Sequence, residues 1–186
     1  MQERDNVLRI FEETKKAVEK GDVLEIKNLS NQTTNTASLT HDPDNIAAAV
    51  IVYSLSKILE RENYKNLPGW KKFYSTYITA IDNIIDSIKR NDDKAYRNNI
   101  ELIQGAMKGI SGMLKEYVQD VFRKAKINKA SKIYEHGMSM EKTASLLGIT
   151  LFELANYAGQ KEACCVPGSK ILPVRTRIKF AMDMFS

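Results

Sequence analysis

Apolar side chains recur every three or four residues along most of this chain, a spacing that places them on one face of an α-helix. Only four prolines occur among its 186 residues, and each lies where another signal also marks the end of a segment. The periodicity predicts helices over about 4–20, 43–62, 70–88 and 92–121, with a further helix beginning after Asp22. The predicted fold class is all-α, with an N-terminal antiparallel bundle of four or five helices.

Two segments depart from this simple pattern. Residues 30–40, SNQTTNTASLT, hold short polar side chains and no charge, and such side chains are poor helix formers because they hydrogen-bond their own backbone. We expect a frayed helix end and a loop there, and the alternative is a polar lining that faces a ligand or partner. Gly105, Gly109 and Gly112 lie inside the predicted helix 92–121, where we expect close helix packing to require them.

Positive charge is concentrated in the C-terminal third of the chain. Residues 1–122 contain 17 Lys and Arg against 18 Asp and Glu, whereas residues 123–186 contain 11 against 5, a net charge of +6. A basic segment attached to a neutral body indicates contact with a polyanion. We therefore expect a helical bundle domain at 1–122 and a basic module at 123–186. An amphipathic helix near the end of the module either closes it or provides a dimer contact.

Residues 128–159 have the pattern of a helix-turn-helix, the second fold element that we predict. Three short helices are expected, the first of which ends at His136. Ser139 caps the second helix, Gly148 ends it, and Thr150 caps the third. Small or apolar side chains fall at the positions where such helices pack together: Ala144, Leu147, Ile149, Leu154 and Tyr157.

The segment 137–150, GMSMEKTASLLGIT, resembles the helix-turn-helix of small antitoxin-like proteins of archaea and other prokaryotes, whose pattern is G-x-S-x-x-x-A-A-x-L-x-G-[IV]-[ST]. Thr143 departs from this pattern, in which alanine is usual. The resemblance covers about thirty residues and implies a DNA-binding regulator or an antitoxin-like factor. The preceding bundle is similar to uncharacterised archaeal helical proteins and loosely to HEPN bundles. Neither His41 nor His136 follows an arginine at the HEPN ribonuclease spacing, so that activity is not implied.

The first turn of the third predicted helix is the part that meets base edges in a DNA-binding helix-turn-helix. Asn156 is the candidate for adenine recognition and Thr150 for a phosphate or a thymine methyl, whereas Phe152 fits a protein contact equally well. Two basic stretches are expected to contact phosphates, and the alternative for both is a solvated surface. The residues concerned are Lys126, Lys129, Lys132, Arg175 and Arg177.

Other kinds of site find little support. The two histidines and the adjacent Cys164 and Cys165 lack the spacing of metal ligands, and neither a glycine-rich phosphate loop nor a nucleophile–base arrangement is present. We expect no enzyme activity, metal or cofactor. No apolar run has the length of a membrane span and no signal peptide is evident, so we expect a cytoplasmic protein with no membrane partner.

The expected function is nucleic-acid binding, with duplex DNA favoured as the partner. Two alternatives stay open at this point. One is a protein-interaction module that uses the helix-turn-helix as a docking surface, and the other is an RNA- or ribosome-associated factor. Formation of a homodimer is a further open alternative.

Overall fold

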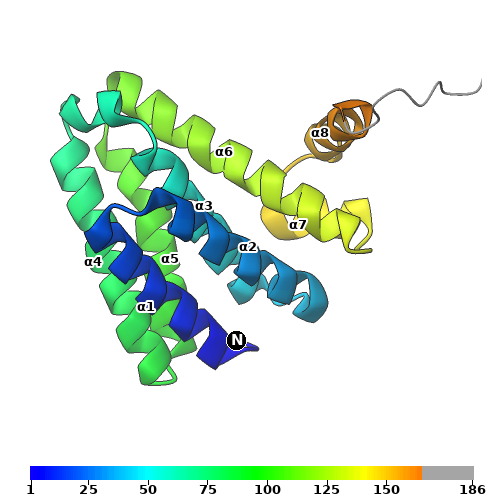
Figure 1. Cartoon of the computed structure of the whole chain (residues 1–186), viewed down its shortest axis with the longest axis horizontal. Coiled ribbons are helices and arrows are strands. Elements are labelled where there is room, and N and C mark those ends of the chain that lie inside the picture. Colours follow the sequence, from blue (N-terminus) through cyan, green and yellow to red (C-terminus); the bar gives the residue numbers. More distant parts are fainter. Residues whose placement is uncertain (165–186) are drawn as a thin grey trace, which may run out of the picture.

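The computed structural model describes residues 1–164, with side chains described as far as residue 159. Every regular element in this part of the chain is a helix and no strand occurs in it, which confirms the all-α class (Figure 1). The α-helices are α1 (Arg4–Lys20), α2 (Val23–Thr40), α3 (Pro43–Leu59), α4 (Trp70–Lys89), α5 (Asp93–Ala106), α6 (Gly112–Glu135), α7 (Met140–Leu147) and α8 (Leu151–Cys164). Short 3-10 turns lie at Glu62–Asn66 and Met107–Gly109.

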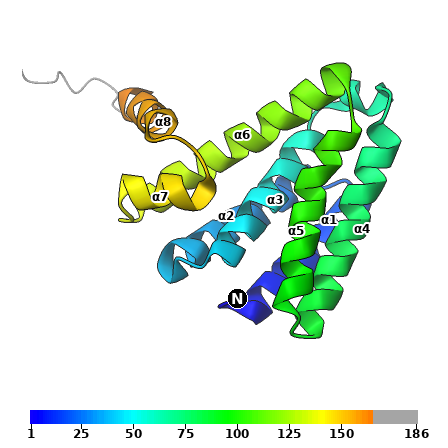
Figure 2. The same ribbon diagram turned by 180° about the vertical axis from the view of Figure 1, so that it is seen from behind.

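Helices α1 to α6 pack around a shared apolar core. α2 packs along α3 and α4 along α5, while α1 contacts both α2 and α4, and α6 lies across α3 and α2. α7 and α8 pack on α6, at the end that lies away from α4 and α5 (Figures 1 and 2). The largest fully buried side chains of the core include Phe11, Phe73, Tyr77 and Tyr96. None of the helices formed by residues 1–164 combines the length and the apolar character that crossing a membrane requires.

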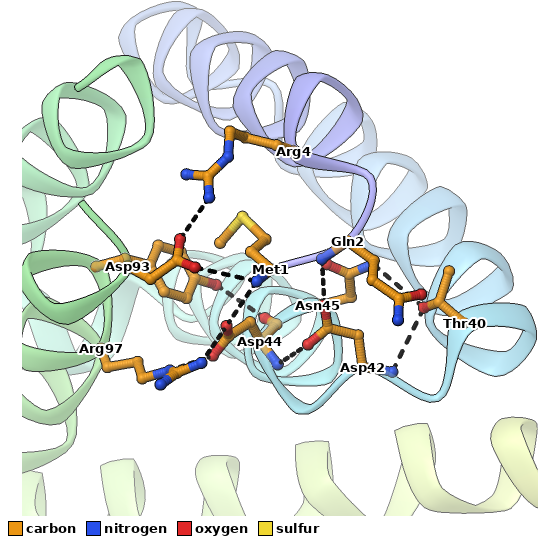
Figure 3. Close-up of polar contacts among 10 residues, drawn as sticks. Met1, Gln2, Arg4, Thr40, Asp42, Asp44, Asn45, Asp93 and Arg97 are labelled. Atoms are coloured by element: carbon orange, nitrogen blue, oxygen red, sulfur yellow. Dashed lines mark hydrogen bonds and ion pairs between the residues drawn. The ribbon is translucent and has the colours of Figure 1, made fainter. Parts of the chain in front are cut away.

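The start of α3 is held by a cluster of charged groups that joins α1, α3 and α5 (Figure 3). Asp42 caps α3 by accepting a hydrogen bond from the Asp44 amide at 2.9 Å, and Pro43 is the first helical residue, as the sequence predicts. Asp44 accepts two bonds from the Arg97 guanidinium, at 2.9 and 3.0 Å. Arg4 donates to Asp93 at 2.7 Å, so each of these three helices is tied to a neighbour by an ion pair.

The expectation of a loop within residues 30–40 is wrong, because α2 continues to Thr40. Ser30, Thr33 and Thr34 are fully buried against neighbouring helices. Ser30 Oγ donates to the Ala49 carbonyl at 2.8 Å, and Thr34 Oγ1 donates to the Ser30 carbonyl at 2.7 Å. Tertiary packing thus outweighs low helix propensity, and the hydroxyls are satisfied by backbone carbonyls. This polar face lies against protein rather than lining a ligand site.

The expectation of one helix over residues 92–121 is also wrong. α5 ends at Ala106, a 3-10 turn follows, and α6 begins at Gly112, which has φ +58°. A Cβ added at Gly105, Gly109 or Gly112 would meet no atom within 4 Å, so close helix packing is not the reason for these glycines. At Gly112 the left-handed backbone conformation is sufficient reason, since glycine adopts it without strain.

α6 is continuous from Gly112 to Glu135 and therefore runs through the expected boundary between residues 122 and 123. The apolar core is continuous as well, because it includes Ala144, Leu147 and Leu154 together with the side chains of the bundle. The change in charge at residue 123 thus falls in the middle of a helix. The division into two domains stays a prediction.

Candidate interaction surface formed by α6, α7 and α8

The C-terminal half of α6 packs with α7 and α8 into a three-helix unit, hereafter the α6–α8 unit. Its helix ends are where the sequence predicts them. Ser139 Oγ accepts a hydrogen bond from the Lys142 amide at 3.3 Å, and Gly148 ends α7 with φ +60°. Thr150 Oγ1 accepts from the Glu153 amide at 3.1 Å, while Glu153 Oε2 accepts from the Thr150 amide at 3.0 Å. This reciprocal pair is a capping box, and it defines the direction in which α8 leaves the turn.

The centre of the unit is formed by small and apolar side chains. Ala144, Leu147 and Leu154 are buried, in agreement with the sequence, whereas Ile149 and Tyr157 are half-buried. Thr143, at the position where the motif usually has alanine, is fully buried and donates to the Ser139 carbonyl at 2.9 Å. Its hydroxyl is therefore satisfied locally, and the departure from the motif leaves the packing intact.

The outer face of α8 is exposed and apolar at its start. Phe152 is 74% exposed and Leu151 is 47% exposed, and Asn156 lies exposed one turn further on. Thr150, the predicted phosphate contact, is also exposed, but its hydroxyl both accepts from the Glu153 amide and donates to Glu153 Oε2 at 2.9 Å. Phe152 and Asn156 thus lie on the face where the sequence places them, while the Thr150 hydroxyl already has two partners.

Lys129 does not lie on an exposed basic face, and that expectation is wrong. Its side chain is fully buried, with Nζ 4.4 Å from the centre of the Tyr53 ring and 3.3 Å from Asn31 Oδ1. Burial, with a smaller contribution from the neighbouring charges of Lys132 and Lys27, lowers the pKa of Lys129 to about 7. The cause is α2, which stays helical through Ser30 and Asn31 and covers this side of α6.

The other predicted phosphate contacts differ in their surroundings. Lys132 is half-buried and donates to Asn31 Oδ1 at 2.6 Å, which ties it to α2. Lys126 is half-buried near the turn between α7 and α8, beside Gly148. Arg175 and Arg177, like the predicted C-terminal amphipathic helix and Cys165, lie outside the described residues.

Two polar contacts attach α8 to α6. Arg123 Nε donates to Glu153 Oε1 at 2.9 Å, and Asn128 Nδ2 donates to the Tyr157 hydroxyl at 3.0 Å. Hydrogen bonds from the Thr150 backbone, and then from Arg123 and the Thr150 hydroxyl, lower the pKa of Glu153 to about 2. Glu153 is therefore ionised at neutral pH, when it both caps α8 and holds it to α6.

A cleft of about 650 Å³ opens between α3, α6 and α8. Its walls include Tyr53 and Lys57 from α3, Tyr117 and Asn128 from α6, and Phe152 and Asn156 from α8. Sequence analysis missed this feature because the residues of α3 and α8 are about a hundred positions apart. Nothing in the sequence distinguishes the tyrosines of the cleft from core residues, because they fall within the apolar stripes that were assigned to the core.

Among the described residues, no group of three His, Cys, Asp or Glu side chains is placed to hold a metal ion. Comparisons of the chain with known protein families, with curated proteins and with solved structures gave no match. The geometry of the α6–α8 unit and of the cleft is therefore the basis for any functional assignment.

Proposed function

We propose that the α6–α8 unit is a helix-turn-helix that binds nucleic acid, with duplex DNA as the favoured target, in a regulator or an antitoxin-like factor. The observation that supports this most strongly is the exposed outer face of α8, a helix that follows a capped α7 and a tight glycine turn. Figure 2 shows α8 directly after α7, on the far side of α6 from the bundle. This is the arrangement in which a recognition helix enters the major groove. The net charge of +6 on residues 123–186 favours the same kind of partner.

In this proposal Asn156 contacts a base and nearby cations contact phosphates. Asparagine can form two hydrogen bonds to the edge of adenine in the major groove. Lys142, exposed in the first turn of α7, lies where the preceding helix of a helix-turn-helix meets the DNA backbone. Lys126 is another described cation near the turn, and Arg175 and Arg177 are further proposed contacts. Lys129 is removed from the set because it is buried.

The decisive experiment measures binding of the whole chain to duplex DNA at several salt concentrations. We expect salt-sensitive binding, and the double variant Lys126→Ala/Lys142→Ala should weaken it for all sequences and reduce the salt slope by about 2. The matched control is Lys71→Ala/Lys72→Ala, which removes two exposed lysines from the start of α4 and should leave the slope unchanged. Absence of any salt-sensitive binding to duplex DNA at low ionic strength would end the proposal.

A second candidate function is docking of a protein through the same helix. The exposed Phe152 and Leu151 favour it, as does the lack of Lys and Arg between residues 151 and 159 of α8. Single substitutions separate the two candidates. If α8 reads DNA, Asn156→Ala removes about 1–3 kcal/mol of discrimination at one adenine. If α8 docks a protein, Phe152→Ala is the damaging change, Asn156→Ala is nearly silent, and partner capture from cell extract survives nuclease treatment.

A further inference from the structure

The cleft between α3, α6 and α8 has the size and the lining of a small-molecule site. Its volume of about 650 Å³ lies within the range of ligand pockets, which extends from roughly 300 to 1,000 Å³. Aromatic rings line it from all three helices, with Tyr53 on α3, Tyr117 on α6 and Phe152 on α8. Surfaces of this kind bind flat aromatic rings by stacking and by edge-to-face contacts.

The charges around the cleft favour an anion. Four cations and three carboxylates line it, and each carboxylate already holds one of the cations. The pairs are Lys57 with Glu60 at 2.7 Å, Lys124 with Asp120 at 2.7 Å, and Arg123 with Glu153 at 2.9 Å. The fourth cation, Arg61, has no carboxylate partner among the described residues, and its guanidinium lies 5.6 Å from the centre of the Tyr117 ring.

Two further residues that line the cleft each have a polar atom with no hydrogen-bond partner among the described residues. Asn128 uses its Nδ2 on the Tyr157 hydroxyl, while its buried Oδ1 has no partner among the described residues. The Tyr53 hydroxyl likewise forms no hydrogen bond with the described part of the chain, and burial raises its pKa, so it keeps its proton at neutral pH. The Tyr53 hydroxyl can therefore form a hydrogen bond with a polar edge of a ligand, whereas Asn128 Oδ1 is covered by protein and does not contribute.

From this arrangement we propose that the cleft binds a planar aromatic anion, a carboxylate on a one- or two-ring system, with its charge on Arg61 and its ring against Tyr53 and Phe152. The guanidinium offers a bidentate contact that matches a carboxylate. Phe152, which is mostly exposed, loses solvent contact when the ring is bound.

Such a ligand would also touch the proposed recognition helix. Phe152 and Asn156 line the cleft and also lie on the exposed face of α8, so a bound anion covers part of the surface offered to a macromolecule. Ligand and macromolecule then weaken each other's binding by the same factor, as linkage requires. This consequence rests on the proposed function, whereas binding of the anion does not.

The test is calorimetric titration of the whole chain, in the absence of nucleic acid, with 2-naphthoate and with its uncharged analogue 2-naphthalenemethanol. We expect 2-naphthoate to bind at least tenfold more tightly than the alcohol, because only the anion engages Arg61. Arg61→Gln should reduce the affinity for 2-naphthoate about tenfold or more and leave the affinity for the alcohol unchanged. Phe152→Ala should weaken the binding of both compounds.

The matched control is Arg90→Gln, which removes another exposed arginine at the end of α4 and should leave both affinities unchanged. Arg61 is itself exposed, so its replacement does not endanger folding, and a circular dichroism spectrum verifies this. The proposal is overturned if 2-naphthoate does not bind at millimolar concentration, if the alcohol binds as tightly, or if Arg61→Gln behaves like Arg90→Gln. Since no DNA is present, each of these results leaves the nucleic-acid proposal standing.

Discussion

Helices α2 and α8 invert the usual relation between polarity and burial. The middle of α2 buries hydroxyl groups, with Ser30, Thr33 and Thr34 fully inside, whereas α8 begins with Leu151 about half exposed and Phe152 mostly exposed. The buried hydroxyls cost little, because each donates to a backbone carbonyl that has a second lone pair available. The exposed aromatic ring has no comparable partner among the described residues. The difference shows that α2 is built for packing, whereas α8 presents the exposed surface on which the proposed function rests.

The largest effect is expected where α2 covers a charge. Lys129 has a pKa of about 7 in the folded protein against 10.5 in the unfolded chain, so the unfolded state binds more protons between these values. The free energy of unfolding should therefore rise as the pH increases from 7 to about 10. Lys129→Met should be more stable than the wild type at pH 6, and this advantage should shrink over that window by up to about 5 kcal/mol.

Urea unfolding of both proteins at pH 6, 8 and 10 measures this change. Lys126→Met, on the same helix but only half-buried, serves as the control and should show a much smaller change with pH. If the difference between Lys129→Met and the wild type does not vary with pH, the lysine is not desolvated and α2 does not cover it.

The next effect concerns the packing that supports α8. Ala144 is buried where α7 meets the rest of the α6–α8 unit, and Ala144→Leu should overpack it and cost about 1–3 kcal/mol. Binding through α8 should be lost with any partner, because α8 no longer has its orientation. Ser145→Leu, at an exposed position next to it, is the control and should retain both stability and binding. Normal stability of Ala144→Leu would show that this crossing is loosely packed.

A smaller effect tests the buried hydroxyls themselves. Thr34→Val removes the 2.7 Å bond to the Ser30 carbonyl and should lower the free energy of unfolding by about 1 kcal/mol. Thr76 makes the same kind of bond, to the Lys72 carbonyl at 2.9 Å, in a solvated position on α4. Thr76→Val should therefore change stability by less than about 0.5 kcal/mol. Chemical denaturation measures both changes. If Thr34→Val and Thr76→Val lose the same free energy of unfolding, burial does not increase the contribution of the α2 hydroxyl to stability.

The smallest change in stability is expected at Phe152. Because this side chain is 74% exposed, Phe152→Ala should alter the free energy of unfolding by less than about 0.5 kcal/mol. Thermal and urea unfolding provide the measurement, with Phe73→Ala, in the core, expected to cost about 3–5 kcal/mol. A large loss of unfolding free energy in Phe152→Ala would show that Phe152 supports the fold. It would also weaken the comparison between α2 and α8.

The local course of the helices was predictable from the sequence. Asp22, Asp42, Ser139 and Thr150 cap helices at the predicted positions, and Gly148 ends α7 as expected. A cap depends on a side chain and on a backbone group within three or four residues, and apolar periodicity depends on one helix alone. Both signals are local, so they can be identified in a short stretch of sequence without knowing how the rest of the chain packs.

Burial was decided by the tertiary structure. Lys129 lies next to Ser30 across 99 positions of sequence, and the cleft combines α3 with α8 across a similar separation. The polar composition of residues 30–40 and the lysine spacing on α6 indicated exposure, yet these two segments pack together. Whether a hydroxyl or an ammonium group meets water or protein depends on which distant helix covers it, and that follows from the packing of the whole core rather than from the residues beside it.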